Sequence, residues 1–315
     1  MRRFALRQGL AGLLALALSA GATSVTAETL RIGYQKYGTL VLLKAEGALD
    51  KRLAEHGWDV QWTEFPGGPQ LLEGLNVGSV EFGSTGEAPP IFAQAAGADL
   101  VYVGYEPAAP TAEAILVPHD SPITRVADLK GKRVALNKGS NVHYLLVRAL
   151  EEAGLSLSDI QPVYLPPADA RAAFESNRVD AWVIWDPFQA AAEQQLKART
   201  LRNGEGLVDN HQFYLSSRTL AEQHPEIVEI LLEEVDKAGP GVEANQAEAV
   251  ALVSPLLGLP EAITQQAVTR KPFAVKPIGE REVSAQQKIA DTFHALRLIP
   301  KPINVAHAVL PSTKE

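Results

Sequence analysis

The sequence predicts an α/β protein made of two hinged lobes, each a mostly parallel sheet flanked by helices. Two observations carry this prediction. Short apolar segments typical of buried strands alternate with longer segments of helical periodicity, and turns rich in glycine and proline separate them. The same order begins again after residue 117, in a chain long enough for two domains of ordinary size.

The first lobe is predicted from successive junctions between strands and helices. Segment 30–33 reads as a strand and 39–56 as the helix after it, while 60–62 and 80–82 begin two further strands. A buried strand is predicted over 100–104. Strands that alternate with helices favour a parallel sheet, and ligands of such sheets bind beyond the carboxyl ends of the strands.

The second lobe shows the same alternation. Strands are predicted over 134–136, 163–165 and 181–185, and each of them is followed by a predicted helix. The segments 76–82 and 177–181, which precede corresponding strands, are also similar to each other. This similarity indicates two units of related build.

We expect the chain to pass between the lobes twice, near Val117 and near Asn210. Lobe 1 would then contain residues 28–117 and 213–315, and lobe 2 would contain residues 118–212. Two crossings of this kind form a hinge.

Residues 1–27 are expected to be an export signal that is cleaved after Ala27. Three arginines precede an apolar run over 10–22, and small residues lie before the cleavage position. This run is too short to anchor the chain in a bilayer. Because there is no cysteine to carry a lipid, we expect a free periplasmic protein.

The composition narrows the classes of function. The chain has 29 basic and 37 acidic residues and a net charge of −8, which becomes −11 once the three arginines of the signal are removed. Such a surface disfavours nucleic acid, so no nucleic-acid partner is expected. The seven histidines show no metal-ligand spacing and cysteine is absent, so we expect no metal and no cofactor.

The first candidate binding segment is residues 80–97. Its strand runs into a glycine-rich turn, and the Pro89–Pro90 pair suits the first turn of a following helix. Free amides at a helix N-terminus bind small anions such as a sulfonate, a phosphate or a carboxylate. The candidate residues in this turn are Ser84, Thr85, Gly86 and Glu87, the last of which could also accept a hydrogen bond from a ligand amine.

A second turn of this kind precedes the helix predicted over 142–153. Its candidate residues are Gly139, Ser140, Asn141 and His143. A capping role alone would explain Ser140 or Asn141, but two turns facing each other would let one anion bind amides of both lobes. A nucleophile-and-base interpretation of Ser140 and His143 is weak, because no acid is placed to orient the histidine.

Aromatic cover for a ligand is predicted at the end of strand 181–185. Trp182 and Trp185 both lie on this strand, and one of the two indoles is expected to belong to the core. Trp185, beside Asp186, could cover the alkyl part of a ligand.

Four segments in combination resemble the periplasmic aliphatic sulfonate-binding proteins that supply ABC importers. They read FPGGPQLL over 65–72, STGEAPP over 84–90, NKGSNVHY over 137–144 and DAWVIWDP over 180–187. The resemblance covers essentially the whole mature chain. It implies a periplasmic-binding-protein (Venus flytrap) fold, and the cleft residues would be Gln35, Ser84, Thr85, Gly86, Glu87, Gly139, Ser140, Asn141, His143, Trp185 and Asp186.

The function implied by the resemblance is that of a receptor rather than an enzyme. The protein would act as a monomer, close on an alkanesulfonate, and deliver it to an ABC permease and ATPase complex at the inner membrane for sulfur acquisition. A receptor of the same fold for taurine, a sulfate ester, nitrate or a pyrimidine is the alternative. The pyrimidine-forming enzymes of thiamine biosynthesis also resemble this fold, but they are cytosolic and carry a cysteine-rich motif, which this chain lacks.

Overall fold

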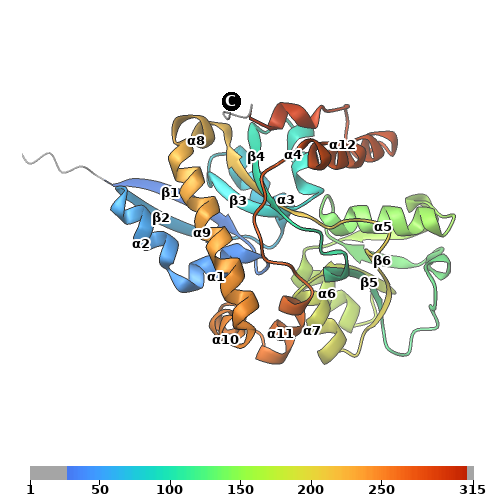
Figure 1. Ribbon diagram of the computed structural model, residues 1–315. Coiled ribbons are helices and arrows are strands. Elements are labelled where there is room, and N and C mark those ends of the chain that lie inside the picture. Colours follow the sequence, from blue (N-terminus) through green and yellow to red (C-terminus); the bar gives the residue numbers. More distant parts are fainter. Residues whose placement is uncertain (1–26, 311–315) are drawn as a thin grey trace, which may run out of the picture.

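The computed structural model describes residues 27–310 (Figure 1). The predicted signal peptide lies outside the described residues, apart from Ala27. Within 27–310 the chain forms two five-stranded sheets, each flanked by helices, and the α/β prediction with two lobes is confirmed.

The first sheet has the strand order β2-β1-β3-β10-β4. Four strands run in one direction, and β10 runs antiparallel to both of its neighbours. The strands are β1 (Glu28–Tyr34), β2 (Trp58–Glu64), β3 (Phe82–Gly86), β4 (Leu100–Glu106) and β10 (Gln212–Ser217).

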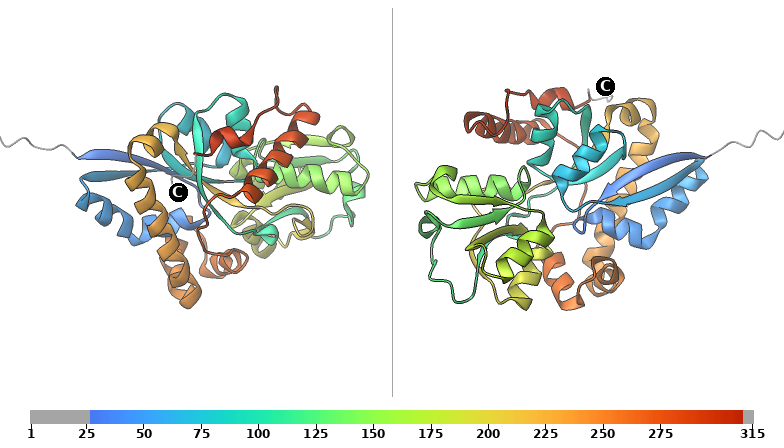
Figure 2. Two further views of the ribbon diagram at one scale, coloured as in Figure 1. Left: turned by 45° about the horizontal axis from the view of Figure 1, so that its top comes forward. Right: turned by 180° about the vertical axis from the view of Figure 1, so that it is seen from behind.

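Helices cover both faces of this sheet (Figures 1 and 2). One apolar cluster includes Leu40, Leu49 and Ile227, and the other includes Ile91 and Phe293. The helices of this lobe are α1 (Thr39–Glu46), α2 (Ala48–Glu55), α3 (Gly68–Asn76), α4 (Pro89–Ala95), α8 (Arg218–Gln223), α9 (Pro225–Ala244), α10 (Gln246–Leu257) and α12 (Glu280–Ala295).

The second sheet repeats this plan with the order β7-β6-β8-β5-β9, in which β5 alone is antiparallel. Because β3 and β8 hold the same third position in the two orders, the topology supports the predicted similarity of the two units. The elements are β5 (Glu113–Val117), β6 (Arg133–Leu136), α5 (Asn141–Glu152), β7 (Gln161–Tyr164), α6 (Pro167–Glu175), β8 (Ala181–Trp185), α7 (Phe188–Gln195) and β9 (Arg199–Asn203).

Two details of the prediction change. The single helix predicted over 39–56 is two helices, because Gly47 takes a left-handed conformation (φ +66°) and its amide caps α1 at the carbonyl of Leu43. The first crossing precedes Glu113, not Val117, since β5 pairs with β8 and β9 in the second sheet. The remaining lobe boundaries stay predictions.

A third contact joins the lobes through α11 (Glu261–Thr269). This helix follows α10 in the sequence but packs on α7, where Ile263 lies against Ala190 and Ala191. The chain then runs over the front of the molecule towards α12 (Figure 1). Among residues 27–310 no single helix is long and apolar enough to cross a membrane, although α10 and α11, bent by 116°, pass that test as a pair.

Candidate functional site

The predicted turns around Ser84 and Ser140 approach each other between the two sheets. A Cβ atom built on Gly86 would lie 2.9 Å from the Cβ of Asn141, so the end of β3 touches the first residue of α5. Both segments lie at the carboxyl ends of parallel strands, β3 in one sheet and β6 in the other. The structure therefore brings the two predicted segments to one place.

The Ser84 segment is a strand end rather than a turn. Pairing with β10 extends β3 as far as Gly86, which lies opposite Gln212, and the following helix α4 begins only at Pro89. The Ser84 hydroxyl accepts a hydrogen bond from Gln212 Nε2 (2.8 Å), and the Ser84 carbonyl accepts one from Gln35 Nε2 (2.9 Å). The predicted residues Gln35 and Ser84 are thus adjacent, and all three side chains are buried.

The second segment presents the N-terminus of the 12-residue helix α5. Ser140 holds the cap position, but its hydroxyl donates to the carbonyl of Asn137 (2.7 Å) and makes no cap bond to the helix. Gly139, with φ +77°, turns the chain so that its amide donates to His143 Nδ1 (3.2 Å). The side chain of Ser140 therefore leaves the first-turn amides of α5 without a cap.

A buried hydrogen-bond donor without a partner lies beside this helix. Asn137 is 6% exposed, and among residues 27–310 its Nδ2 has no hydrogen-bond acceptor. It faces the other lobe, because a Cβ atom on Gly67 would lie 2.6 Å from this nitrogen. Buried donors are normally paired, so the site has unused capacity to bind an anion.

Trp185 forms an apolar wall next to Asn137, against the same glycine, Gly67. It is the last residue of β8, is 4% exposed, and lies edge-to-face against Phe188. A Cβ atom built on Gly67 would lie 3.7 Å from the Cη2 atom of its indole ring. Thr85, also buried, would be 3.0 Å from a Cβ on Gly68, so the glycine pair lets backbone approach both side chains.

Glu87 and His143 are both buried and each accepts a hydrogen bond from a backbone amide, His143 from Gly139 of the second segment. Glu87 accepts a hydrogen bond from the amide of His211 (3.2 Å), and burial raises its pKa to about 8. His143 is packed among Phe92, Tyr164 and Phe293, and burial, with a smaller contribution from Lys138, lowers its pKa to about 4. Both side chains are therefore buried next to the two segments.

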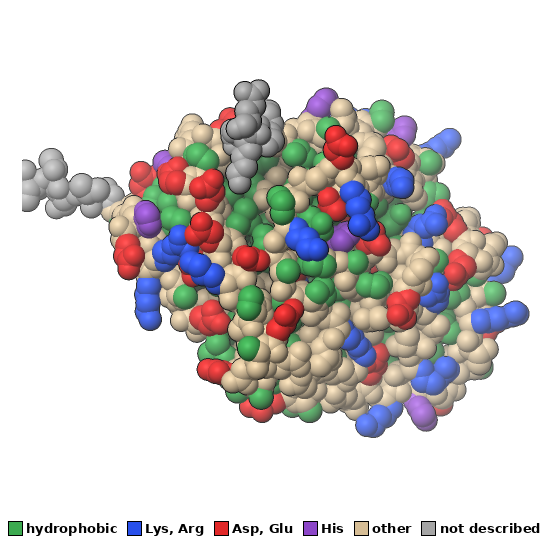
Figure 3. Space-filling model, viewed as in Figure 1, with side chains coloured by type: hydrophobic (Ala, Val, Ile, Leu, Met, Phe, Trp, Pro, Cys, Tyr) green, Lys and Arg blue, Asp and Glu red, His purple; other side chains and the backbone are tan. Residues whose placement is uncertain are grey.

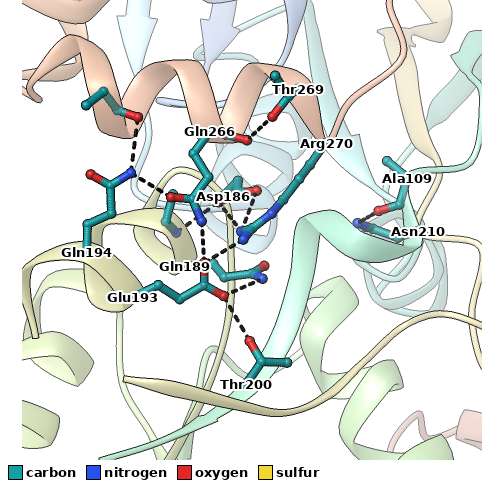
Figure 4. A network of polar contacts seen from close by, with 12 residues as sticks. Ala109, Asp186, Gln189, Glu193, Gln194, Thr200, Asn210, Gln266, Thr269 and Arg270 are labelled. Carbon is teal, nitrogen blue, oxygen red and sulfur yellow. Dashed lines mark hydrogen bonds and ion pairs between the residues drawn. The ribbon is translucent and has the colours of Figure 1, made fainter. Parts of the chain in front are cut away.

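Asp186 belongs to a polar network between α7 and the segment after α11 (Figure 4). Its carboxylate accepts hydrogen bonds from Arg270 (3.3 Å) and from the amide of Ala190 (3.0 Å). Burial raises the Asp186 pKa to about 6, although Arg270 opposes that shift. Arg270 also pairs with Glu193, so this network joins the lobes.

Four further residues at this contact were not among the predicted site residues. Two have been described above, Gln70 Oε1 would lie 3.1 Å from a Cβ on Gly67, and Glu113 accepts a hydrogen bond from Asn141. Asn137 and Gln70 lie inside the segments that carry the family resemblance, so that signal could have indicated them. Gln212 and Glu113 lie on the strands next to the crossings, where no pattern in the sequence distinguishes them. Among the described residues, no group of three or more His, Cys, Asp or Glu could hold a metal ion.

Comparison with known proteins places these observations in a family. The NMT1/THI5 like family model matches residues 53–249. The alkanesulfonate-binding protein SsuA from Xanthomonas axonopodis pv. citri, solved bound to MOPS, is 47% identical with a TM-score of 0.86, over 90% of this chain and 98% of that one. The periplasmic aliphatic sulphonate binding protein SsuA from Escherichia coli is 46% identical with a TM-score of 0.83, over 91% and 94%. An aliphatic sulfonates-binding protein from Escherichia coli (strain K12) is 46% identical over 311 residues, which are 98% of this chain and 97% of the relative.

Proposed function

Because the chain belongs to the NMT1/THI5 like family and is similar to aliphatic sulfonate-binding proteins over almost its whole length, we propose that it binds an alkanesulfonate between its two lobes. The observation that carries this proposal is the buried Asn137 Nδ2, which has no acceptor among residues 27–310 and lies beside the uncapped N-terminus of α5.

The chemistry of the site suits a single negative charge. Among the described residues, no lysine or arginine side chain makes a hydrogen bond or ion pair with Ser84, Asn137 or Asn141. A sulfonate spreads one charge over three oxygens, so amides and neutral side chains can bind it without a full counter-charge. Gln35, Thr85, Gly86, Gly139 and Ser140 shape this head-group site, and Trp185 covers the alkyl chain.

Delivery to a transporter follows from the two-lobe architecture. Ligand bound between hinged lobes stabilises the closed form, and an ABC permease and ATPase complex would recognise that form. We propose that the protein acts in the periplasm as a monomer, after removal of residues 1–27, and that it catalyses no reaction. Turnover of a sulfonate or a sulfate ester by the pure protein would contradict the last point.

Calorimetric titration tests the ligand class. Ethanesulfonate should bind at least tenfold more tightly than taurine, nitrate or a free pyrimidine. Taurine must bury an ammonium group as well as the sulfonate, and the other two lack a sulfonate with an alkyl chain. A clear preference for nitrate or the pyrimidine would contradict the sulfonate assignment and favour the alternative, a receptor of the same fold for that ligand.

A further inference from the structure

Glu113 is a fully buried carboxyl at the interlobe contact that the binding proposal does not use. It is the first residue of β5, directly after the first crossing, and it is 0% exposed. Its Oε2 accepts a hydrogen bond from Asn141 Nδ2, while its Oε1 has no partner among residues 27–310. The side chain thus bonds the residue that begins α5.

Asn141 connects this carboxyl to both crossings. Its Nδ2 also donates to Asn210 Oδ1 (3.0 Å), and Asn210 Nδ2 donates to the carbonyl of Ala109 (2.9 Å). Ala109 lies in the first crossing and Asn210 in the second, and the two crossings are further joined by a bond from the Ala109 amide to the Asp209 carbonyl (3.0 Å). One chain of hydrogen bonds therefore joins the hinge to the N-terminus of α5.

Among residues 27–310, no lysine, arginine or histidine forms an ion pair with Glu113. The titratable groups that act on it are Glu87, two residues before α4, and Tyr37, from the loop after β1. Arg270 is paired with Asp186 and Glu193, and Lys271 with Glu106. A fully buried carboxylate with a single amide donor and acidic neighbours is very unfavourable, so the neutral acid is the form that this environment accepts. Burial, with the charge of Glu87, raises the Glu113 pKa well above its usual range.

We propose that Glu113 is a positioning residue that, as a neutral acid, orients Asn141 at the head of α5 and so couples sulfonate binding to retention of a proton. This inference rests on the proposed function.

Ionised Glu113 would oppose binding in two ways. It would place a negative charge next to the helix N-terminus that receives the anion, and it would hold Asn141 Nδ2 in a stronger, charge-assisted bond. Sulfonates themselves stay ionised at every pH at which the protein is folded, so the ligand contributes no titration of its own. Affinity should therefore fall as pH rises through the Glu113 pKa, by up to tenfold per pH unit.

The test is the affinity for ethanesulfonate from about pH 5 to about pH 9, measured by calorimetry in two buffers of different ionisation enthalpy. We expect wild-type affinity to fall at alkaline pH and binding there to take up a proton. In Glu113→Gln, which keeps the shape and the acceptor oxygen, affinity at low pH should stay within about threefold of wild type and the fall should disappear. Glu87→Gln, which removes the buried carboxyl whose charge acts on Glu113, should retain the fall.

The outcomes separate this inference from the proposed function. An affinity of the wild type that is independent of pH, or a fall that persists in Glu113→Gln or is abolished by Glu87→Gln, overturns the role of Glu113 but leaves sulfonate binding intact. Failure of the wild type to bind ethanesulfonate at any pH removes both proposals. If Glu113→Gln does not fold, proton uptake by the wild type that survives in Glu87→Gln supports the role, and uptake that is lost there contradicts it.

Discussion

Gly86 shows how a missing side chain shapes the proposed site. Its Cβ position would lie 2.9 Å from the Cβ, the Cγ and the Oδ1 of Asn141, all on the opposite lobe. Its backbone is not in the left-handed region, so alanine is compatible with the local conformation. The absence of a methyl group at this position is therefore what permits the lobes to meet.

Gly86→Ala should lower the affinity for ethanesulfonate at least tenfold, because the added methyl group keeps the lobes apart. Calorimetric titration measures this change. Gly241→Ala is the matched control: among the described residues, apart from the neighbouring backbone of its own helix, no heavy atom lies within 4 Å of that Cβ position. Affinity should be unchanged and the helix slightly stabilised, by at most about 1 kcal/mol. Equal affinities of Gly86→Ala and the wild type would show that closure does not involve this contact.

His143 makes the stability of the protein depend on pH. Its folded-state pKa of about 4 lies below its ordinary value of 6.5, so the unfolded chain takes up the proton first. The stability from the neutral ring is present above about pH 6.5 and is lost as pH falls towards 4, by up to about 3 kcal/mol. The raised pKa of Glu87 acts oppositely, because its contribution is lost as pH rises towards 8.

His143→Phe should therefore reduce the loss of unfolding free energy between pH 6.5 and pH 4, as measured by urea denaturation, while it keeps an aromatic ring against Phe92. His119→Gln, at an exposed position, controls for the removal of a histidine. A pH dependence of His143→Phe equal to that of the wild type would show that another group dominates.

The sequence indicated which segments form the candidate site better than it indicated their roles. Gly86 and Asn141, one from each predicted segment, meet as expected, since segments at equivalent strand ends converge when two similar lobes face each other. Glu87 and Asp186 are hydrogen-bonded to His211 and Arg270, and their contact with a ligand stays a prediction. These partners lie 124 and 84 residues away in the sequence, and no local pattern specifies them.

Among the helices, α11 is the element that ties the lobes together away from the candidate site. Its apolar contact through Ile263 is small, so the polar network of Figure 4 provides much of the connection. Arg270 lies between the fully buried Asp186 and Glu193, and Gln194 bonds Gln266 of α11 (2.6 Å). The network thus fixes α7 against the first lobe.

Arg270→Gln should destabilise the protein by about 3 kcal/mol, because it leaves the Asp186 charge buried without a cation. Chemical denaturation measures this loss, and Asp186→Asn added to Arg270→Gln should recover part of it. Arg148→Gln, which breaks the exposed pair with Glu151, should change stability by no more than about 0.5 kcal/mol. If Arg270→Gln lost as little stability as Arg148→Gln, water would already screen the charge of Asp186, and the network would not be a buried one.

The order of elements followed closely from the sequence, because alternating strands and helices leave few arrangements. The errors lie where one residue or one tertiary pairing decides the outcome. A left-handed Gly47 divides a helix that periodicity alone reads as continuous. Pairing of Gly86 with Gln212, across 126 residues of sequence, turns an expected loop into the end of β3.

At the scale of the whole molecule, acidic and basic side chains are interspersed on the face seen in Figure 3, and neither kind forms a continuous patch there. Its net charge of −8 nevertheless opposes an anionic ligand. Attraction must then come from short-range dipoles and hydrogen bonds within the closed interface, where water is excluded and polar contacts are stronger.

Ligand binding should stabilise the folded protein by mass action. At a free ethanesulfonate concentration one hundred times Kd, the gain is about 2.7 kcal/mol, which corresponds to a rise in Tm of roughly 4–5 °C for a chain of this size. Ethanesulfonamide, a neutral analogue of similar shape, is the control and should give little rise. Comparable shifts with both compounds would show that the negative charge is not what the protein recognises.

The central claim is that an anion is held between the lobes by the N-terminus of α5 and by Asn137. A crystal structure of the protein with ethanesulfonate tests it most directly. We expect the sulfonate oxygens within about 3 Å of Asn137 Nδ2 and of the first amides of α5, with the ethyl group against Trp185. A sulfonate bound elsewhere on the molecule, with Asn137 Nδ2 still without an acceptor, would contradict the account.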